Sequence, residues 1–135
     1  PHLEHLERHK HADLFLDTFN YNAHTTASDA LWSGTPIITK QGNQFAARVA
    51  SSLLSALDLN ELVTKSSKDY EDLIFKLASN PTKLKALRLK LKLNITCKSL
   101  FNTELFTKHL ESGYLLVYQN YFQGRPPETI NVPNN

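Results

Sequence analysis

Two short apolar segments near the N-terminus have the pattern of buried β-strands. Residues 12–18 read ADLFLDT, and the unbroken apolar run Leu14, Phe15 and Leu16 is typical of a parallel strand covered on both faces. Residues 36–39 read PIIT and show the same brief apolar run. The pattern therefore predicts two short parallel strands in this part of the chain.

Helical spacing of apolar residues fills most of the remaining chain. It predicts helices over residues 2–11, 26–33, 44–57, 68–79, 81–94 and 103–122, with a short helix or turn at 60–63. Gly34 is a typical residue for ending a helix, and Pro36 cannot continue one. Pro81 suits the first turn of the helix that follows it. The tail from residue 124 onward, GRPPETINVPNN, predicts extended chain.

The face that each helix buries follows from the same spacing. Leu87, Leu89, Leu91 and Leu93 alternate with basic residues as in a strand, but Lys, Leu, Ala and Arg favour a helix, which we predict for 81–94. The expected contact residues are Phe45, Val49 and Leu53 in the helix 44–57, and Tyr70, Leu73, Ile74 and Leu77 in the helix 68–79. They are Leu84, Leu87 and Leu91 in the helix 81–94, and Leu105, Phe106, Leu110, Leu115, Tyr118 and Phe122 in the helix 103–122.

The order of these elements predicts an α/β fold. A helix, a strand, a helix, a strand and then only helices indicate a doubly wound parallel sheet with a mostly helical C-terminal half. Two strands are too few for a complete sheet of this kind. We therefore expect the remaining strands to precede Pro1, in a longer protein of which this chain is a part.

Composition narrows the function classes. The 135 residues carry 15 Lys and Arg against 13 Asp and Glu, and a net charge of +2 does not argue for nucleic acid. Cys97 is the single cysteine, so no internal disulfide or cysteine zinc site forms, which indicates an intracellular (cytoplasmic) protein. No apolar run approaches the roughly 20 residues that span a membrane, and no signal peptide is visible.

The segment NAHTTASDALWSGTP, residues 22–36, concentrates polar residues at one predicted helix start. Thr26 and Asp29 have the spacing of a capping box, which is worth about 1 kcal/mol of helix stability. The helix also follows a strand of an α/β sheet, where ligands bind, and its hydroxyls, free N–H groups and positive dipole end suit a diphosphate. Asp29, one turn further on, suits ribose hydroxyls. The pattern by itself favours the cap.

Three other polar groups are candidates for binding. His2, His5 and His9 share a helical face and could hold a metal, although a solvated histidine face is the simpler interpretation. Lys83, Lys85, Arg88, Lys90 and Lys92 form a basic run without interleaved aromatic residues, which favours a solvated face. Arg48 faces either the ligand cleft or a structural partner.

The segment HADLFLDTFNYNAHTTASDALWSGTP resembles the C-terminal catalytic lobe of the O-GlcNAc transferases, in a bacterial-type homologue. QGNQFAARVASSLL, YEDLIFKLASNP, LFNTELFTKHLESGYLLVYQNY and GRPPETI resemble later parts of the same lobe. The resemblance implies a GT-B fold, with a partial nucleotide-sugar-binding lobe over residues 1–99 and a closing helix with its tail over residues 100–135.

The resemblance also assigns roles to single residues. His24, Thr25 and Thr26 match the residues that contact the diphosphate of the donor, and Asp29 matches the acid that holds the ribose. His5 matches a histidine that stacks on uracil, and Arg8 matches a basic position beside it. His2 stands where the family usually has a lysine next to the uracil. Catalytic and acceptor-side residues, the phosphate-binding lysine and tetratricopeptide (TPR) repeats are expected upstream.

The implied reaction transfers N-acetylglucosamine from UDP-GlcNAc to Ser or Thr hydroxyls of proteins with inversion, and it requires no metal and no cofactor. The fragment by itself is expected to be inactive. Two alternatives stay open: a SPINDLY-type protein O-fucosyltransferase that uses GDP-fucose, and a non-catalytic protein-interaction domain. His24 and Asp29 favour the UDP-sugar, since the SPINDLY pattern resembles a threonine run followed by Glu.

Overall fold

The computed structural model describes residues 2–133, apart from the side chain of His2. Within this range lie α1 (His2–His9), β1 (Phe15–Leu16), α2 (Thr25–Trp32), β2 (Ile37–Lys40), η1 (Phe45–Ala47), α3 (Val49–Ala56), η2 (Asn60–Leu62), β3 (Val63–Thr64), α4 (Ser67–Ala78), α5 (Pro81–Cys97), η3 (Ser99–Phe101) and α6 (Thr103–Phe122). The chain divides into two compact units, Pro1–Leu100 and Phe101–Asn135.

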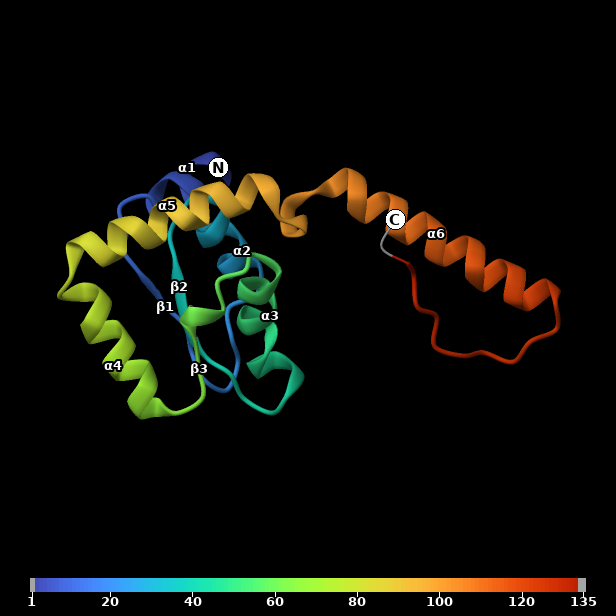
Figure 1. Ribbon diagram of the computed structural model, residues 1–135, viewed down its shortest axis with the longest axis horizontal. Coiled ribbons are helices and arrows are strands. Elements are labelled where there is room, and N and C mark those ends of the chain that lie inside the picture. The colour runs from blue at the N-terminus through green and yellow to red at the C-terminus, as the bar shows by residue number, and fades with distance from the viewer. Residues whose placement is uncertain (1, 134–135) are drawn as a thin grey trace. The chain divides into compact units, whose positions relative to one another are not determined.

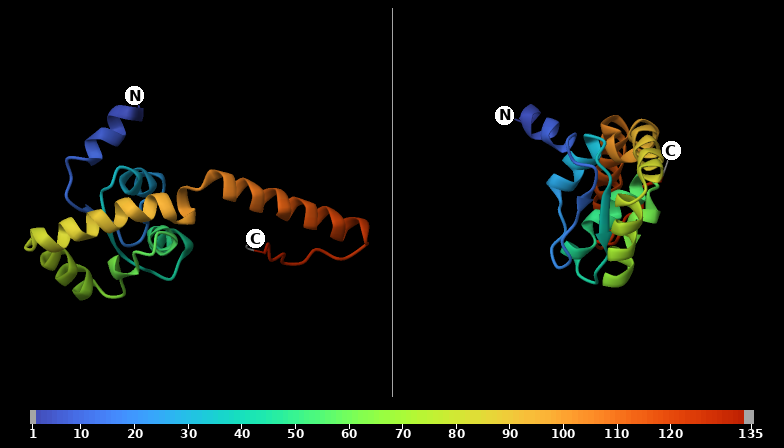
Figure 2. Two further views of the ribbon diagram at one scale, coloured as in Figure 1. Left: turned by 45° about the horizontal axis from the view of Figure 1, so that its top comes forward. Right: turned by 90° about the vertical axis from the view of Figure 1, so that its left-hand side faces the viewer.

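The first unit is built on a parallel sheet of three strands in the order β1-β2-β3 (Figure 1). Phe15 pairs with Ile37, and Thr39 pairs with Val63. In the right-hand view of Figure 2, the sheet lies between α1 on one side and α4 and α5 on the other. Because all three strands are parallel, their carboxyl ends meet at one edge, where ligands bind in folds of this kind.

The predicted number and burial of the strands were partly wrong. β3 was missed, because its two residues, Val63 and Thr64, are too few to produce an alternating pattern. The predicted strand at 12–18 is present as Phe15–Leu16, but it is not covered on both faces, since Leu16 is 51% exposed. β1 pairs only with β2 among the described residues and is therefore an edge strand of this sheet.

The core of this unit lies around β2. Its fully buried side chains include Leu31, Ile37, Ile38, Leu54, Leu57, Leu59, Leu62 and Leu91. Gly34 ends α2, as predicted. Its φ of +83° is a conformation that other residues adopt only with strain. This turn lets the chain reverse directly into β2.

The helix predicted over 44–57 is broken in two. Residues Phe45–Ala47 form a 3-10 turn, and α3 begins at Val49 after Arg48, whose φ of −122° is not helical. Gly42 packs against this turn so closely that a Cβ atom there would lie 2.6 Å from that of Ala47. The buried face of α3 consists of Ala50, Ser51 and Leu54, whereas Phe45 is 74% exposed.

The segment that could have been a strand is the long helix α5. Asn80 caps it by accepting a hydrogen bond from the Lys83 N–H at 3.0 Å, and Pro81 occupies its first turn. Leu87 and Leu91 are buried on the predicted face, and Leu89 and Leu93 are exposed.

The basic residues of α5 have local partners or face solvent. Lys90 pairs with Glu61 at 2.6 Å, and Arg88 lies 3.5 Å from Asp13. Lys83, Lys85 and Lys92 are exposed. The solvated interpretation of the basic run therefore suits its geometry.

The second unit consists of α6 and the extended tail. Asn102 caps α6 through a hydrogen bond from the Leu105 N–H at 3.0 Å. None of the described side chains of α6 is buried, and Phe106, Leu115 and Tyr118 are each more than 60% exposed. The face predicted to make contacts is thus largely unpacked within this unit.

No described helix of the chain combines the length and the apolar character needed to cross a bilayer.

Candidate functional site

Three of the predicted site residues meet between α1 and α2. The Nε2 atom of His5 lies 3.3 Å from Oδ2 of Asp29, and Nη2 of Arg8 lies 3.2 Å from Nδ1 of His5. The side chains of His5 and Asp29 are 32% and 18% exposed. His5 and Arg8 also line a concave surface of about 490 Å³ on α1, which a ligand can reach. The side chain of His2, the low-weight candidate beside them, lies outside the described residues.

The arrangement fixes the proton positions of the His5 ring. Arg8 can only donate hydrogen bonds, so Nδ1 of His5 accepts and carries no proton. The proton of His5 is therefore on Nε2, where it is shared between Asp29 and Nε2 of His9, which lies 3.3 Å away. His9 was predicted to belong to a solvated histidine face or, less simply, to a metal site, whereas its Nε2 atom is a hydrogen-bond partner of His5.

His9 is also electrostatically perturbed. Burial lowers the pKa of His9 below 6.5, and the neighbouring His5 lowers it further, while Asp29 opposes this and Arg8 adds a smaller decrease. The backbone carbonyl of His9 accepts a hydrogen bond from the Thr35 hydroxyl at 2.6 Å. This bond fastens the end of α1 to the turn after α2.

The start of α2 presents its polar groups outward. The helix begins at Thr25, so His24 is the N-cap residue and its side chain forms no cap hydrogen bond. Ser28 is the first residue whose N–H is bonded within the helix, at 3.1 Å to the His24 carbonyl. The N–H groups of Thr25, Thr26 and Ala27 are therefore outside the helical ladder, at its positive end.

The structure contradicts the capping box that the spacing of Thr26 and Asp29 favoured. Thr26 lies inside the first turn, not at the cap position, and the Asp29 carboxylate contacts His5. Both Thr25 and Thr26 are exposed, and neither hydroxyl has a hydrogen-bond partner within the part of the chain that is described. These groups have no structural role that would compete with a ligand.

A buried carboxylate at the end of β1 holds the loop that leads to this helix. Oδ1 of Asp17 accepts the N–H groups of Thr18 at 2.9 Å and Ala23 at 2.7 Å, and Oδ2 accepts the Thr39 hydroxyl at 2.7 Å. The Tyr70 hydroxyl donates to the Asp17 carbonyl at 2.9 Å. Burial, with Asp17 adding to it, raises the pKa of Tyr70, so this phenol stays a donor.

These supporting residues were missed by the sequence analysis. Asp17 in the segment LFLDT was a usable signal, because an Asp directly after a strand can accept N–H groups of the following loop. Nothing in the pattern pointed to Thr39 or Tyr70, which reach Asp17 from β2 and α4. We name Asp17, Thr39 and Tyr70 the loop brace.

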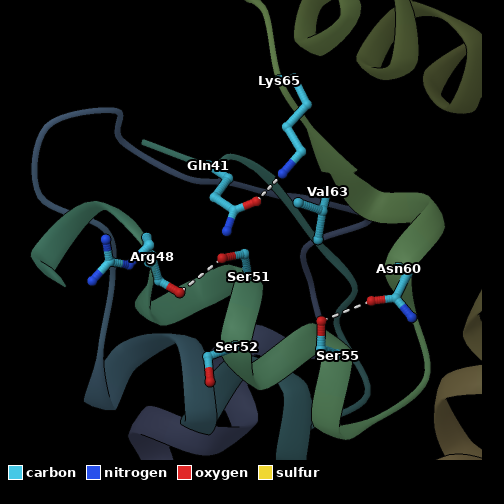
Figure 3. Close-up of a pocket in the computed structure, with 8 residues that line it drawn as sticks. All are labelled: Gln41, Arg48, Ser51, Ser52, Ser55, Asn60, Val63 and Lys65. Atoms are coloured by element: carbon cyan, nitrogen blue, oxygen red, sulfur yellow. Dashed lines mark hydrogen bonds between the residues drawn. The ribbon is translucent and has the colours of Figure 1, made fainter. Parts of the chain in front are cut away.

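A second hollow, of about 520 Å³, lies at the carboxyl ends of β2 and β3 (Figure 3). Its hydrogen bonds join Lys65 to Gln41, and Ser55 to Asn60 at 2.7 Å. Arg48 lines this hollow, and its guanidinium donates to the Asn43 carbonyl, which is the kind of structural partner that was expected as one alternative. None of the predicted donor-site residues lines this hollow.

No group of three metal-binding side chains is found among the described residues. His5 contacts both His9 and Asp29 directly, each at 3.3 Å. The described part of the histidine cluster thus behaves as a hydrogen-bonded unit.

Comparison with known proteins places this geometry in context. The sequence profile described as Glycosyl transferase family 41 matches residues 1–110. A probable UDP-N-acetylglucosamine–peptide N-acetylglucosaminyltransferase SEC of Arabidopsis thaliana is 38% identical over 134 residues, which are 98% of this chain and 14% of that protein. The UDP-N-acetylglucosamine–peptide N-acetylglucosaminyltransferase of Caenorhabditis elegans is 35% identical over 94% of this chain and 11% of its own length.

A probable UDP-N-acetylglucosamine–peptide N-acetylglucosaminyltransferase SPINDLY of Oryza sativa subsp. japonica is 35% identical over 92% of this chain and 13% of its own length. A solved O-GlcNAc transferase of Thermobaculum terrenum, a lysine-to-methionine mutant, superposes with a TM-score of 0.84 at 32% identity, over 92% of this chain and 24% of that one. The predicted Rossmann-like lobe of the GT-B type is thereby confirmed, with three strands in place of two. The chain spans only 11 to 14% of the length of these curated relatives.

Replacing Asp17 with Asn should release the loop before α2. Asn offers one acceptor oxygen where the carboxylate offers two, so at least one of its three donors loses its partner, which costs about 1–3 kcal/mol of unfolding free energy. Hydrogen exchange at the Ala23 amide should accelerate, while the exposed Asp72→Asn serves as the matched control. Unchanged protection of Ala23 would show that Asp17 does not hold the loop.

The lowered pKa of His9 predicts a pH dependence of stability. Between that pKa and 6.5 the unfolded chain binds more protons than the folded one, so stability should rise with pH in this window and level off above 6.5. Melting temperature measured against pH should show this rise in the unmodified protein and a smaller one in His9→Gln. The exposed His11→Gln should keep the full rise; an equal loss in both variants would contradict the assignment to His9.

Proposed function

Because the chain belongs to glycosyl transferase family 41, we propose that it forms the donor-binding part of a protein O-GlcNAc transferase. Such an enzyme moves N-acetylglucosamine from UDP-GlcNAc to Ser or Thr hydroxyls of proteins, with inversion. One observation carries the proposal: the side chains of His5 and Asp29 meet, with Arg8 bonded to His5, one turn along from the open start of α2. The names of the relatives from Arabidopsis thaliana and Caenorhabditis elegans support this donor.

The start of α2 is proposed to bind the diphosphate. Its unpaired N–H groups and the hydroxyls of Thr25 and Thr26 are donors that a phosphate accepts, and the helix dipole favours the negative charge. His24 lies at the cap position, next to the same charge. When the sugar leaves, negative charge builds up on UDP, and donors already in place stabilise it without a metal ion.

The nucleoside is proposed to lie against α1. The ring of His5 offers a flat face to uracil, and Arg8 holds that ring through Nδ1. The Asp29 carboxylate accepts hydrogen bonds from ribose hydroxyls. It is only 18% exposed and contacts His5, so its orientation is restricted before the ribose binds. His2, which precedes this pair on α1, is proposed as a minor base contact.

The whole enzyme requires more than this chain. We propose that residues 1–99 complete their lobe with upstream strands and that residues 100–135 close it. The catalytic base and the acceptor protein site then belong to an upstream lobe, and the TPR repeats also precede this chain in the same protein. An intracellular site of action is proposed from the single cysteine. Alone, the chain is half a donor site and is expected to be inactive.

UDP binding by the full-length parent protein tests the site. Asp29→Ala should weaken UDP binding about tenfold or more, since it removes charged hydrogen bonds to ribose, and Thr26→Val should weaken it about threefold to tenfold. Isothermal titration calorimetry gives both values. Asp72→Ala and Thr96→Val are matched exposed controls and should bind like the unmodified protein. Unchanged affinity in both site variants would remove the site assignment.

Titration of UDP against GDP separates the proposed enzyme from a SPINDLY-type fucosyltransferase. The stacking position of His5 and the pair His24 and Asp29 lead us to expect UDP to bind at least tenfold more tightly than GDP. Tighter binding of GDP would favour GDP-fucose as the donor. A parent protein that binds neither nucleotide and does not hydrolyse UDP-GlcNAc would instead be a non-catalytic interaction protein.

A further inference from the structure

Two aromatic rings contact the imidazole of His24. Tyr21 stacks on it with ring centroids 4.8 Å apart and an angle of 12° between the planes. Phe45 approaches the same ring edge-on, at 6.3 Å and 88°. The imidazole has no hydrogen bond within the described residues, and its Nε2 atom is buried without a partner. Ring contacts therefore decide which way this side chain points.

The two aromatic residues are themselves joined through the backbone. The Asn22 N–H donates to the Ala46 carbonyl at 2.8 Å, which ties the residue after Tyr21 to the residue after Phe45. The Asn22 side chain donates to the Thr18 carbonyl at 2.8 Å, and the Thr18 hydroxyl donates to the Tyr21 carbonyl. The backbone of Tyr21 is thus fixed although the residue is 66% exposed.

Tyr21 is an exposed aromatic residue in a loop whose backbone is anchored by hydrogen bonds. A side chain that is two-thirds exposed adds little to the hydrophobic core, so the ring of Tyr21 has little value for stability. Offset aromatic stacking is directional, however, and holds a partner ring in one orientation. The partner here is the N-cap residue of α2, next to the positive helix end where an anion would bind.

We propose that Tyr21 is a positioning residue of the donor site, which acts by holding the His24 imidazole in place for the diphosphate. The inference rests on the proposed function and adds a residue to it. A ring held in one rotamer before UDP arrives loses less conformational freedom on binding. Phe45 contacts the same ring at a right angle, so His24 has aromatic contacts with both Tyr21 and Phe45.

The parent protein provides the test, with UDP affinity measured by calorimetry. Tyr21→Leu keeps an apolar side chain but removes the aromatic face, and it should weaken UDP binding about threefold to tenfold. Tyr21→Phe keeps the face and should bind UDP like the unmodified protein. Phe75→Leu, which changes another exposed aromatic residue on α4, is the matched control and should have no effect.

A double-mutant cycle shows whether Tyr21 acts through His24. In a His24→Ala background, Tyr21→Leu should have no further effect on the UDP affinity, because the ring it positions is gone. The melting temperatures of all variants should agree within a few degrees, which separates positioning from unfolding. An undiminished effect of Tyr21→Leu without His24, or a full loss in Tyr21→Phe, would overturn the proposal in favour of a direct contact with the ligand.

These results also separate this inference from the function on which it rests. If the parent protein binds UDP and Tyr21→Leu binds it equally well, the positioning role is wrong and the donor site stands. If the unmodified parent protein binds no UDP, the proposed function fails and the positioning role fails with it.

Discussion

The buried carboxylate of Asp17 is the interaction on which the candidate site depends. A carboxylate that is 4% exposed is costly unless its oxygens accept hydrogen bonds, and here they accept two N–H groups and one hydroxyl. Those donors come from the loop after β1 and from β2, while α4 reaches the same residue through Tyr70. The need to satisfy one charge thus fixes the loop from which α2 begins.

A second constraint acts between the helices. His5 accepts from Arg8 on one nitrogen and shares the proton of the other between Asp29 and His9. Arg8 can only donate, the Asp29 carboxylate can only accept, and the tautomer of each histidine follows from its partner. The chain of hydrogen bonds therefore has one consistent proton arrangement. The flat face of His5 and the carboxylate of Asp29 are consequently presented together, before any ligand is bound.

The contacts within this chain position the candidate site but leave other surfaces exposed. Leu16 on β1 and the aromatic residues of α6 are exposed within the chain. Apolar surface of this kind marks sites of contact with other protein segments. The relatives are several times longer than this chain, so partners within one parent protein are consistent with the family to which it belongs.

The sequence by itself determined the order of the helices, the end of α2, and the helical state of residues 81–94. Those features depend on residues close together in the chain: Gly34 at a left-handed turn, Pro81 in a first turn, and leucines three or four apart. The resemblance carried by HTTASD also singled out the residues that line the candidate donor site, whose binding roles remain predictions.

Only the tertiary structure decided what those residues do without a ligand. On spacing alone Thr26 and Asp29 form a capping box, yet His5, which lies 24 positions before Asp29, takes the carboxylate instead. The loop brace and the stack of Tyr21 on His24 were equally invisible, since Thr39, Tyr70 and Phe45 reach the site from other elements. Local patterns state which groups a segment offers, and the packing of distant segments determines which group each one meets.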